Sequence, residues 1–376
     1  MQLLVPTNWD PDLILPLSKL EADVQLYGVL PTSMIGSGGT GPDYIRMAEN
    51  QAEEYIEQAH LAGLKFDYLL NAPSMGNMEW DESTHQELLM HLDWITSIGA
   101  DSVTVTMPYL IELIKRQFPR LKIRVSTIAH VNSVARAKSV ESLGADSITL
   151  DINVNRDFAL LKAIRNAVSC ELTILMNNLC LYQCPYEYYH HDGLGHASQS
   201  YNPLAGYYVD YCVLRCTLDR LCDISQVIKC RWVRPEDIHI YEEIGMDVFK
   251  ISGRAMPAER ILHAATAYSS RHYEGNLYDI LNVITPKTSV QNNVSVASPR
   301  FYIDNQALEG FVDFFKKQNC LSGCGQCNYC QRIADKVIQF DRDEVDEYTA
   351  MLSASLDNLS SSRLFRVKAG AKKHLR

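Results

Sequence analysis

The stretch LGADSITL at residues 143–150 carries the pattern that decides the fold. It recurs with small changes as IGADSVTV at residues 98–105 and IGMDVFKI at residues 244–251. Each copy places a glycine at the end of a helical segment, then an aspartate, then a β-rich run. Glycine readily adopts the left-handed conformation that ends a helix. The repeated unit is therefore a helix, a glycine stop and a strand.

Eight β-rich runs alternate with amphipathic segments through about the first 270 residues. The predicted strands cover residues 24–30, 64–70, 102–107, 122–126, 147–152, 172–177, 227–233 and 248–252. Such alternation predicts an α/β fold with a parallel sheet covered by helices, and eight is the strand number of a (β/α)8 TIM-type barrel. An open doubly wound sheet would show the same alternation and remains the alternative.

The alternation stops near residue 275, and the composition turns polar over residues 285–298, TPKTSVQNNVSVAS. This change predicts a barrel domain of residues 1–275 and a Cys-rich C-terminal extension of residues 276–376. Neither a signal peptide nor an apolar run of membrane-spanning length is apparent, so we expect a cytoplasmic protein without a membrane partner. The formal net charge of −10 argues against a broad nucleic-acid surface.

Cysteines form two groups, and in a reduced compartment such groups indicate metal binding or catalysis rather than disulfides. The first group follows the predicted strand 172–177. We rank four of its members as the preferred metal ligands, Cys180, Cys184, Cys216 and Cys230, ahead of Cys212 and Cys222. By the predicted strands they lie at the C-terminal face of the barrel, where barrel enzymes carry their active sites. Thiolates gathered there suit a [4Fe–4S] cluster or zinc.

The second group has the spacing C-x3-C-x2-C-x2-C at Cys320, Cys324, Cys327 and Cys330. Four thiolates this close together fit either structural zinc or a [4Fe–4S] cluster, and we favour the cluster. The first three also match the triad of radical S-adenosylmethionine enzymes, but that triad belongs after the first barrel strand. A second cluster would transfer electrons to the barrel cluster or stabilise it.

Three further residues are candidates for catalysis. Arg254 and Arg234 follow predicted strands, where a guanidinium group could bind a substrate carboxylate, and His196 lies in a glycine-flanked turn, where it could move protons. The alternatives are an exposed polar loop for the histidine and structural ion pairs for the arginines. No residue is expected to bind a nucleotide, because the loop GSGGTG at 36–41 lacks the Lys-Ser/Thr of a P-loop.

Residues 171–254 resemble the peptidase U32 family. A strand leads into MNNLCLYQCPYEYYHH at 176–191, a cysteine-bearing insertion follows, and the segment closes with YEEIGMDVFKISGR at 241–254. The resemblance extends in organisation over residues 1–275. It implies a [4Fe–4S] cluster used for oxygen-independent hydroxylation of RNA bases or a quinone precursor, with prephenate as oxygen donor in some members. Other members are described as collagenase-like peptidases.

This chain departs from the family motif through its tighter Cys180-x3-Cys184-Pro pair and its His-rich stretch, so the substrate does not carry over. We expect an iron–sulfur enzyme that hydroxylates, or otherwise modifies by redox chemistry, a small molecule, a peptide or an RNA. One alternative is a metal-dependent collagenase-like peptidase, although the chain contains neither HExxH nor GxSxG. The other is a non-catalytic zinc-bound scaffold or sensor.

Overall fold

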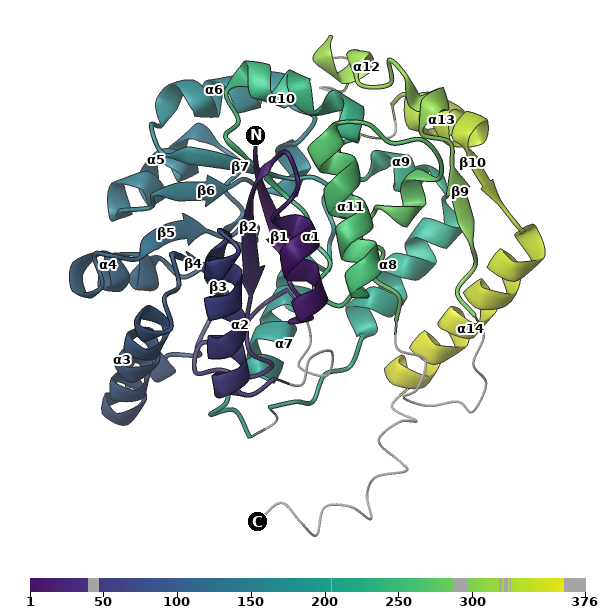
Figure 1. The fold of residues 1–376 in the computed structure, drawn as a ribbon. Coiled ribbons are helices and arrows are strands. Elements are labelled where there is room, and N and C mark those ends of the chain that lie inside the picture. Colours follow the sequence, from purple (N-terminus) through teal and green to yellow (C-terminus); the bar gives the residue numbers. More distant parts are fainter. Residues whose placement is uncertain are drawn as a thin grey trace.

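Eight parallel strands close into a barrel in the computed structural model, which describes residues 1–39, 47–203, 205–286, 297–317, 320, 324 and 326–361. The strands follow the chain in order around the barrel (Figure 1). Their bounds are β1 Gln2–Pro6, β2 Asp23–Gly28, β3 Lys65–Leu70, β4 Ser102–Val105, β5 Lys122–Val125, β6 Ser147–Thr149, β7 Glu171–Leu175 and β8 Val248–Lys250. Pairing of Gln2 with Val248 joins β1 to β8 and closes the sheet. The predicted TIM-type barrel is confirmed.

One predicted strand is wrong, and one observed strand was missed. Residues 227–233 do not enter the sheet: helix α9, Ser225–Lys229, occupies the first part and Cys230 caps it. An apolar run this short can be buried as a helix or as a strand, and here α9 packs against α13, Tyr329–Val337, of the C-terminal extension. The missing strand is β1 at the N-terminus, where three consecutive apolar residues are fully buried.

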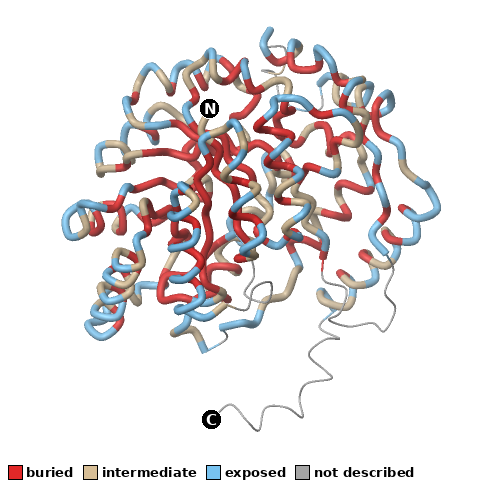
Figure 2. Tube along the Cα trace, viewed as in Figure 1, coloured by how far each residue is buried: buried red, intermediate tan, exposed pale blue. Residues whose placement is uncertain are grey.

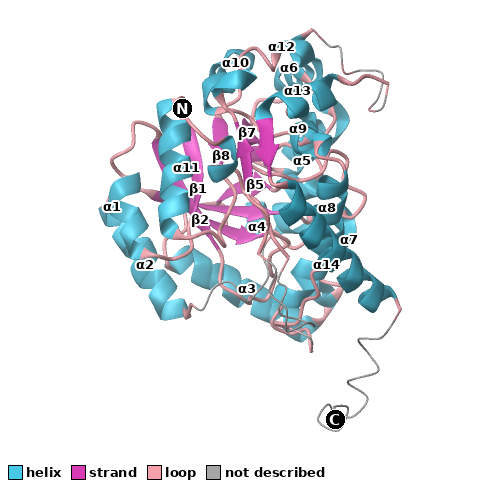
Figure 3. Cartoon of the chain, turned by 90° about the vertical axis from the view of Figure 1, so that its right-hand side faces the viewer, coloured by secondary structure: helices cyan, strands magenta, loops and turns pink. Residues whose placement is uncertain are grey.

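Helices surround the strands (Figure 3). Those outside the barrel include α2 Glu49–Leu61, α3 Glu82–Ser97, α4 Pro108–Gln117, α5 Val134–Leu143, α6 Phe158–Ala167, α10 Ile238–Ile244 and α11 Ala258–Ser270. Two of the predicted glycine stops cap helices in the left-handed conformation, Gly144 after α5 at φ 115° and Gly245 after α10 at φ 94°. The repeated pattern therefore marks the turns that lead into β6 and β8.

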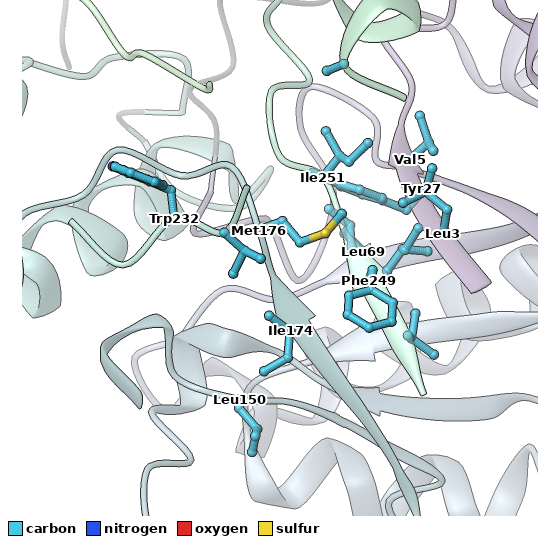
Figure 4. Packing of buried hydrophobic residues seen from close by; sticks show 14 of the residues in the cluster. Leu3, Val5, Tyr27, Leu69, Leu150, Ile174, Met176, Trp232, Phe249 and Ile251 are labelled. Carbon is cyan, nitrogen blue, oxygen red and sulfur yellow. The ribbon is translucent and has the colours of Figure 1, made fainter. Parts of the chain in front are cut away.

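The hydrophobic core follows the strands, which are buried along most of their length, while the outer faces of the helices are exposed (Figure 2). Figure 4 shows part of this core, including Leu3, Val5, Tyr27, Leu69, Ile174 and Phe249. Some strands, such as β4, alternate apolar residues with polar ones, and polar side chains form hydrogen bonds inside the barrel. Asp67, for example, accepts from the hydroxyl of Ser102 at 2.6 Å.

The C-terminal extension packs beside the barrel (Figure 1). It contains an antiparallel pair, β9 Phe301–Ile303 and β10 Ile338–Phe340, and helices α12 Asp313–Lys316, α13 and α14 Arg342–Ser360. Helix α14 packs on α8, Tyr211–Cys222, just as α13 packs on α9. The division at residue 275 stays a prediction. Among the described residues no helix is both long and apolar enough to cross a membrane.

Candidate functional site

The four cysteines ranked first from the sequence come together beyond the end of β7. Cys180 and Cys184 lie in the loop between β7 and α7, Glu187–Ser198, while Cys216 lies on α8 and Cys230 ends α9. Burial raises the pKa of the Cys180 thiol well above its ordinary value, and the nearby acidic groups of Glu187, Cys216, Cys184 and Cys230 raise it further. Three separate elements, one loop and two helices, thus place these thiols within electrostatic reach of Cys180.

A buried arginine, Arg220, lies among these thiols. It follows Cys216 by one turn of α8 and donates to the carbonyl of Leu179 at 2.6 Å and to the hydroxyl of Thr217 at 3.1 Å. Burial lowers the pKa of its guanidinium, but Cys216, Cys230 and Cys180 raise it by more. No ion pair joins Arg220 to a carboxylate within the described ranges. Its charge is therefore balanced only when the cysteines are thiolates.

The remaining two barrel cysteines differ from each other. Cys212 is buried one turn before Cys216, and its Sγ atom lies 3.9 Å from the carbonyl oxygen of Tyr186. Cys222, at the last position of α8, is exposed. Cys212 is thus close to the four-cysteine group, whereas Cys222 faces solvent.

The spacing of the thiols separates two kinds of metal. Zinc bonds of about 2.3 Å in a tetrahedron would bring the sulfur atoms to about 3.8 Å from one another. In the described part of the chain, no three cysteines have Sγ atoms that all lie within 4.8 Å of one another. A [4Fe–4S] cluster binds each thiolate to a different iron atom and so needs a wider arrangement. As placed, these thiols are therefore spaced more widely than a tetrahedral zinc site requires.

The C-terminal cysteines are more open. Cys324 and Cys327 are exposed, and Cys320 and Cys330 are half-buried. Burial raises the pKa of the Cys330 thiol, with Cys324 and Cys320 among its acidic neighbours. The structure therefore brings three of these cysteines near one another, at the start of α13.

Two arginines lie between the two cysteine groups. Burial lowers the pKa of Arg156 to about 10, and both Cys330 and Cys230 act on it electrostatically. Arg231 packs its guanidinium 3.8 Å from the centre of the Tyr182 ring, and its Nη2 atom lies 3.9 Å from Cys320 Sγ. Both arginines line a cavity of about 230 Å³. The two groups are thus neighbours separated by cationic side chains.

Arg254, the arginine of the closing motif, lies beyond the end of β8. Its Nη2 atom donates to Ser37 Oγ at 3.0 Å, and Ser37 in turn donates to Asn71 at 2.9 Å. Its Nη1 atom is buried without a hydrogen-bond partner. Burial lowers the pKa of Arg254 to about 10. A buried guanidinium with a free donor is suited to binding an anionic substrate group.

The other two catalytic candidates lie elsewhere. His196, on α7, is partly exposed and pairs with Asp192 at 3.5 Å. Arg234 donates to Asn305 at 3.0 Å and to the carbonyl of Leu308 at 3.1 Å, and also pairs with Glu236 at 3.4 Å. Arg234 thus joins the barrel to the extension, as the structural alternative supposed. None of these contacts is with a cysteine of the barrel group. Catalytic roles for His196 and Arg234 remain predictions.

A group of residues at the mouth of the barrel was not predicted from the sequence. His130 follows β5, Asp151 follows β6, and Glu187 begins α7 after β7. The Nδ1 atom of His130 lies 3.3 Å from Asp151 and 3.9 Å from Glu187. Burial raises the pKa of the Glu187 carboxyl to about 7. The sequence offered little signal: His130 lies a few residues after the predicted strand 122–126, and Asp151 lies near the end of the predicted strand 147–152.

Lys250 was also overlooked, although it lies within the quoted closing motif. It is the last residue of β8, its Nζ atom lies 4.2 Å from the centre of the Tyr27 ring, and burial lowers its pKa to about 7. The position of Lys250 at the end of a strand could have marked it as a residue of the barrel interior.

Comparison with known proteins agrees with the resemblance. Residues 45–184 match the model of peptidase family U32. A protein of Methanocaldococcus jannaschii described as an uncharacterized protease is 33% identical over 301 residues, covering 76% of this chain and 82% of that protein. A solved U32 peptidase structure shares 22% identity at a TM-score of 0.49, over 67% of this chain and 92% of that one. By the extent of its match to the M. jannaschii protein, the chain belongs to the peptidase U32 family.

Proposed function

We propose that the chain is an enzyme with a [4Fe–4S] cluster bound by Cys180, Cys184, Cys216 and Cys230. It would carry out oxygen-independent hydroxylation, or a related redox modification, of a small-molecule, peptide or RNA substrate. The observation that carries this proposal is the buried Arg220 beside three of these four thiols, without a carboxylate partner in the described residues. An unpaired buried charge is costly, so a compensating anion is expected beside it. A cluster with four thiolate ligands is such an anion.

When bound, the cluster would supply a one-electron centre or a Lewis acid at the mouth of the barrel. The chain's own residues have separate tasks. Arg254 would orient an anionic group of the substrate with its unpartnered Nη1 atom, on the Ser37 side of the mouth. The group of His130, Asp151 and Glu187 would give or accept a proton, through a side chain or through a water bound there. An acidic chain favours a small molecule or a peptide over a long RNA.

We infer a second metal site at Cys320, Cys324, Cys327 and Cys330, holding a second [4Fe–4S] cluster or zinc. Arg156 and Arg231 between the two groups would balance the negative charge of both sites. A cluster at the second site would exchange electrons with the barrel cluster, because the two cysteine groups are neighbours.

The test is the visible spectrum of anaerobically purified protein before and after dithionite. A brown chromophore that bleaches on reduction is expected. Colourless protein that retains zinc would overturn the proposal and leave the zinc-bound scaffold or the peptidase.

A metal-dependent collagenase-like peptidase is the second candidate. The description of the M. jannaschii relative as a protease and the convergence of His130, Asp151 and Glu187 favour it. Cleavage of denatured collagen that needs no reductant and stops on chelation of divalent metal would establish it. The same assay should show no cleavage if the chain is a redox enzyme.

A further inference from the structure

A group of metal-binding side chains lies at the barrel mouth outside the set of cysteines. His130, Asp151 and Glu187 each offer one ligand atom, and these three atoms all lie within 4.8 Å of one another. The residues follow three neighbouring strands, β5, β6 and β7, at the C-terminal face of the barrel. Closure of the barrel, rather than local sequence, brings them together.

A fourth side chain, His191, adjoins this group with a defined orientation. Its Nδ1 atom lies 2.6 Å from the carbonyl oxygen of Gly38. A carbonyl oxygen can only accept, so Nδ1 carries the proton, and in the neutral ring Nε2 presents a lone pair. That lone pair faces Glu187 Oε1 at 4.0 Å. Metal-binding histidines commonly use their second nitrogen in this way to fix the ring.

The carboxylates of the group have no arginine or lysine partner among the described residues. Asp151 is almost completely buried, and the side chain of Glu187 is 16% exposed. The nearby cation, Arg136, donates to the carbonyl oxygen of His130 and to Asn132 rather than to either carboxylate. Two carboxylates and a histidine lone pair thus converge, and in the described residues no arginine or lysine pairs with either carboxylate. A bound cation would pair with these carboxylates.

The supporting contacts hold the ligands in place. Asp151 accepts from Asn132 at 3.2 Å and from the backbone and side chain of Asn153 at 2.9 and 2.8 Å. His130 has a left-handed backbone with φ 51°, an uncommon conformation for a residue other than glycine. Such a conformation is kept where the surroundings fix it, and it occurs often at functional sites.

We propose that His130, Asp151 and Glu187, with His191 as a fourth ligand, bind one divalent transition-metal ion at the mouth of the barrel. Two imidazole nitrogens and two carboxylates suit Mn²⁺, Fe²⁺ or Zn²⁺ rather than the softer ions that thiolates select. The ion acts as a Lewis acid on a bound water or a substrate oxygen. No cysteine is among these ligands, and the proposal does not depend on the iron–sulfur proposal, although Glu187 lies near Cys180.

The test is a titration of the full-length, anaerobically prepared protein with Mn²⁺, with free Mn²⁺ followed by electron paramagnetic resonance. Mn²⁺ prefers oxygen and nitrogen ligands, so we expect it to bind this group in preference to the cysteine groups. Wild-type protein should bind one ion per chain. The variants are Glu187→Gln and His130→Asn, because asparagine tolerates the left-handed backbone. The matched control is His60→Gln, which breaks an exposed His60–Asp101 pair of 3.1 Å that has no third ligand.

Both ligand variants should weaken Mn²⁺ binding by at least about tenfold, while His60→Gln leaves it unchanged. Their iron and sulfide contents should match wild type, which shows that they fold. The inference is overturned if wild-type protein shows no saturable Mn²⁺ binding, or if binding survives both substitutions; the group is then an Asp–His–Glu arrangement that shares protons. Mn²⁺ binding by protein without sulfide would uphold this site and remove the iron–sulfur proposal.

Discussion

The two cysteine groups each bring four thiols together, but they do so in different ways. The barrel group is assembled from a loop and two helices and lies beside the buried Arg220. Cys230 is buried, and Cys180, Cys184 and Cys216 are half-buried. The C-terminal group lies within residues 320–330, and Cys324 and Cys327 are exposed. Compact spacing made the second group the clearer motif in the sequence. Burial and a matched cation make the first the more protected site in the fold.

This difference indicates separate roles. A buried cluster at the C-terminal face of the barrel can meet the substrate while solvent is excluded. An exposed site beyond the barrel is open to a redox partner but is also easily lost. The two groups should therefore differ in how they respond to substitution, chelation and the loss of an arginine.

The largest expected effect is the loss of the barrel cluster in Cys216→Ser. This substitution removes one of the four inner thiols, so iron and acid-labile sulfide should each fall by about four per chain. The measurement is metal and sulfide analysis after anaerobic purification. Cys222→Ser is the control: the thiol of Cys222 lies on the same helix but is exposed, and its loss should change neither value. Equal losses in both variants would mean that the inner group is not the ligand set.

Arg220→Gln should destabilise the protein only when metal is bound. Removing the cation beside a cluster leaves the cluster's negative charge unbalanced, at a cost of about 3 kcal/mol in the free energy of unfolding. Without metal, burial keeps the thiols protonated, so the cost should be below about 1 kcal/mol. Anaerobic urea titrations of both forms, followed by circular dichroism, measure this difference. An equal cost in the two forms would show that Arg220 is merely structural.

Chelation should proceed in two phases. A strong iron or zinc chelator should remove metal from the exposed C-terminal group roughly tenfold faster than from the barrel group, a barrier difference of about 1.4 kcal/mol. The measurement is release of metal over time under anaerobic conditions. Cys324→Ser should abolish the fast phase and leave the slow phase unchanged. A single phase, or loss of the slow phase in this variant, would contradict the expected difference in metal release between the two cysteine groups.

The smallest expected effect concerns Arg231, which lies between the two cysteine groups. Arg231 lies beside Cys320 but donates to no carboxylate in the described residues, so Arg231→Gln should weaken only the C-terminal site. The fast phase of metal release should speed up about threefold, which corresponds to about 0.6 kcal/mol. Arg116→Gln, an exposed arginine on α4, is the control. A change in the slow phase instead would assign Arg231 to the barrel cluster.

Most of the barrel could be predicted because the sequence patterns of its strands, helices and turns depend on neighbouring residues. Strand and helix periods alternate, and Gly144 and Gly245 mark turns that depend only on their immediate neighbours. The segment 227–233 was mistaken for a strand because its burial comes from the packing of α9 against α13, a contact between distant parts of the chain. Strand β1 was missed because five residues that end in a proline give too short a pattern.

The candidate site likewise contains residues that could be predicted from the sequence and residues that could not. Candidate cysteine ligands can be recognised from the sequence alone, so the group near Cys180 could be ranked before the fold was known. Arg220 could not be found, because only its burial and its missing carboxylate partner distinguish it from an ordinary helical arginine. His130, Asp151 and Glu187 are far apart along the chain and meet only when β5, β6 and β7 lie side by side.

The most direct test of the central claim uses protein in which Cys320, Cys324, Cys327 and Cys330 are all replaced by serine. This variant isolates the barrel group. Iron and acid-labile sulfide, measured after anaerobic purification, should each be present at about four per chain, with a chromophore that bleaches on reduction. Zinc without sulfide, or no metal at all, would contradict a [4Fe–4S] cluster in the barrel.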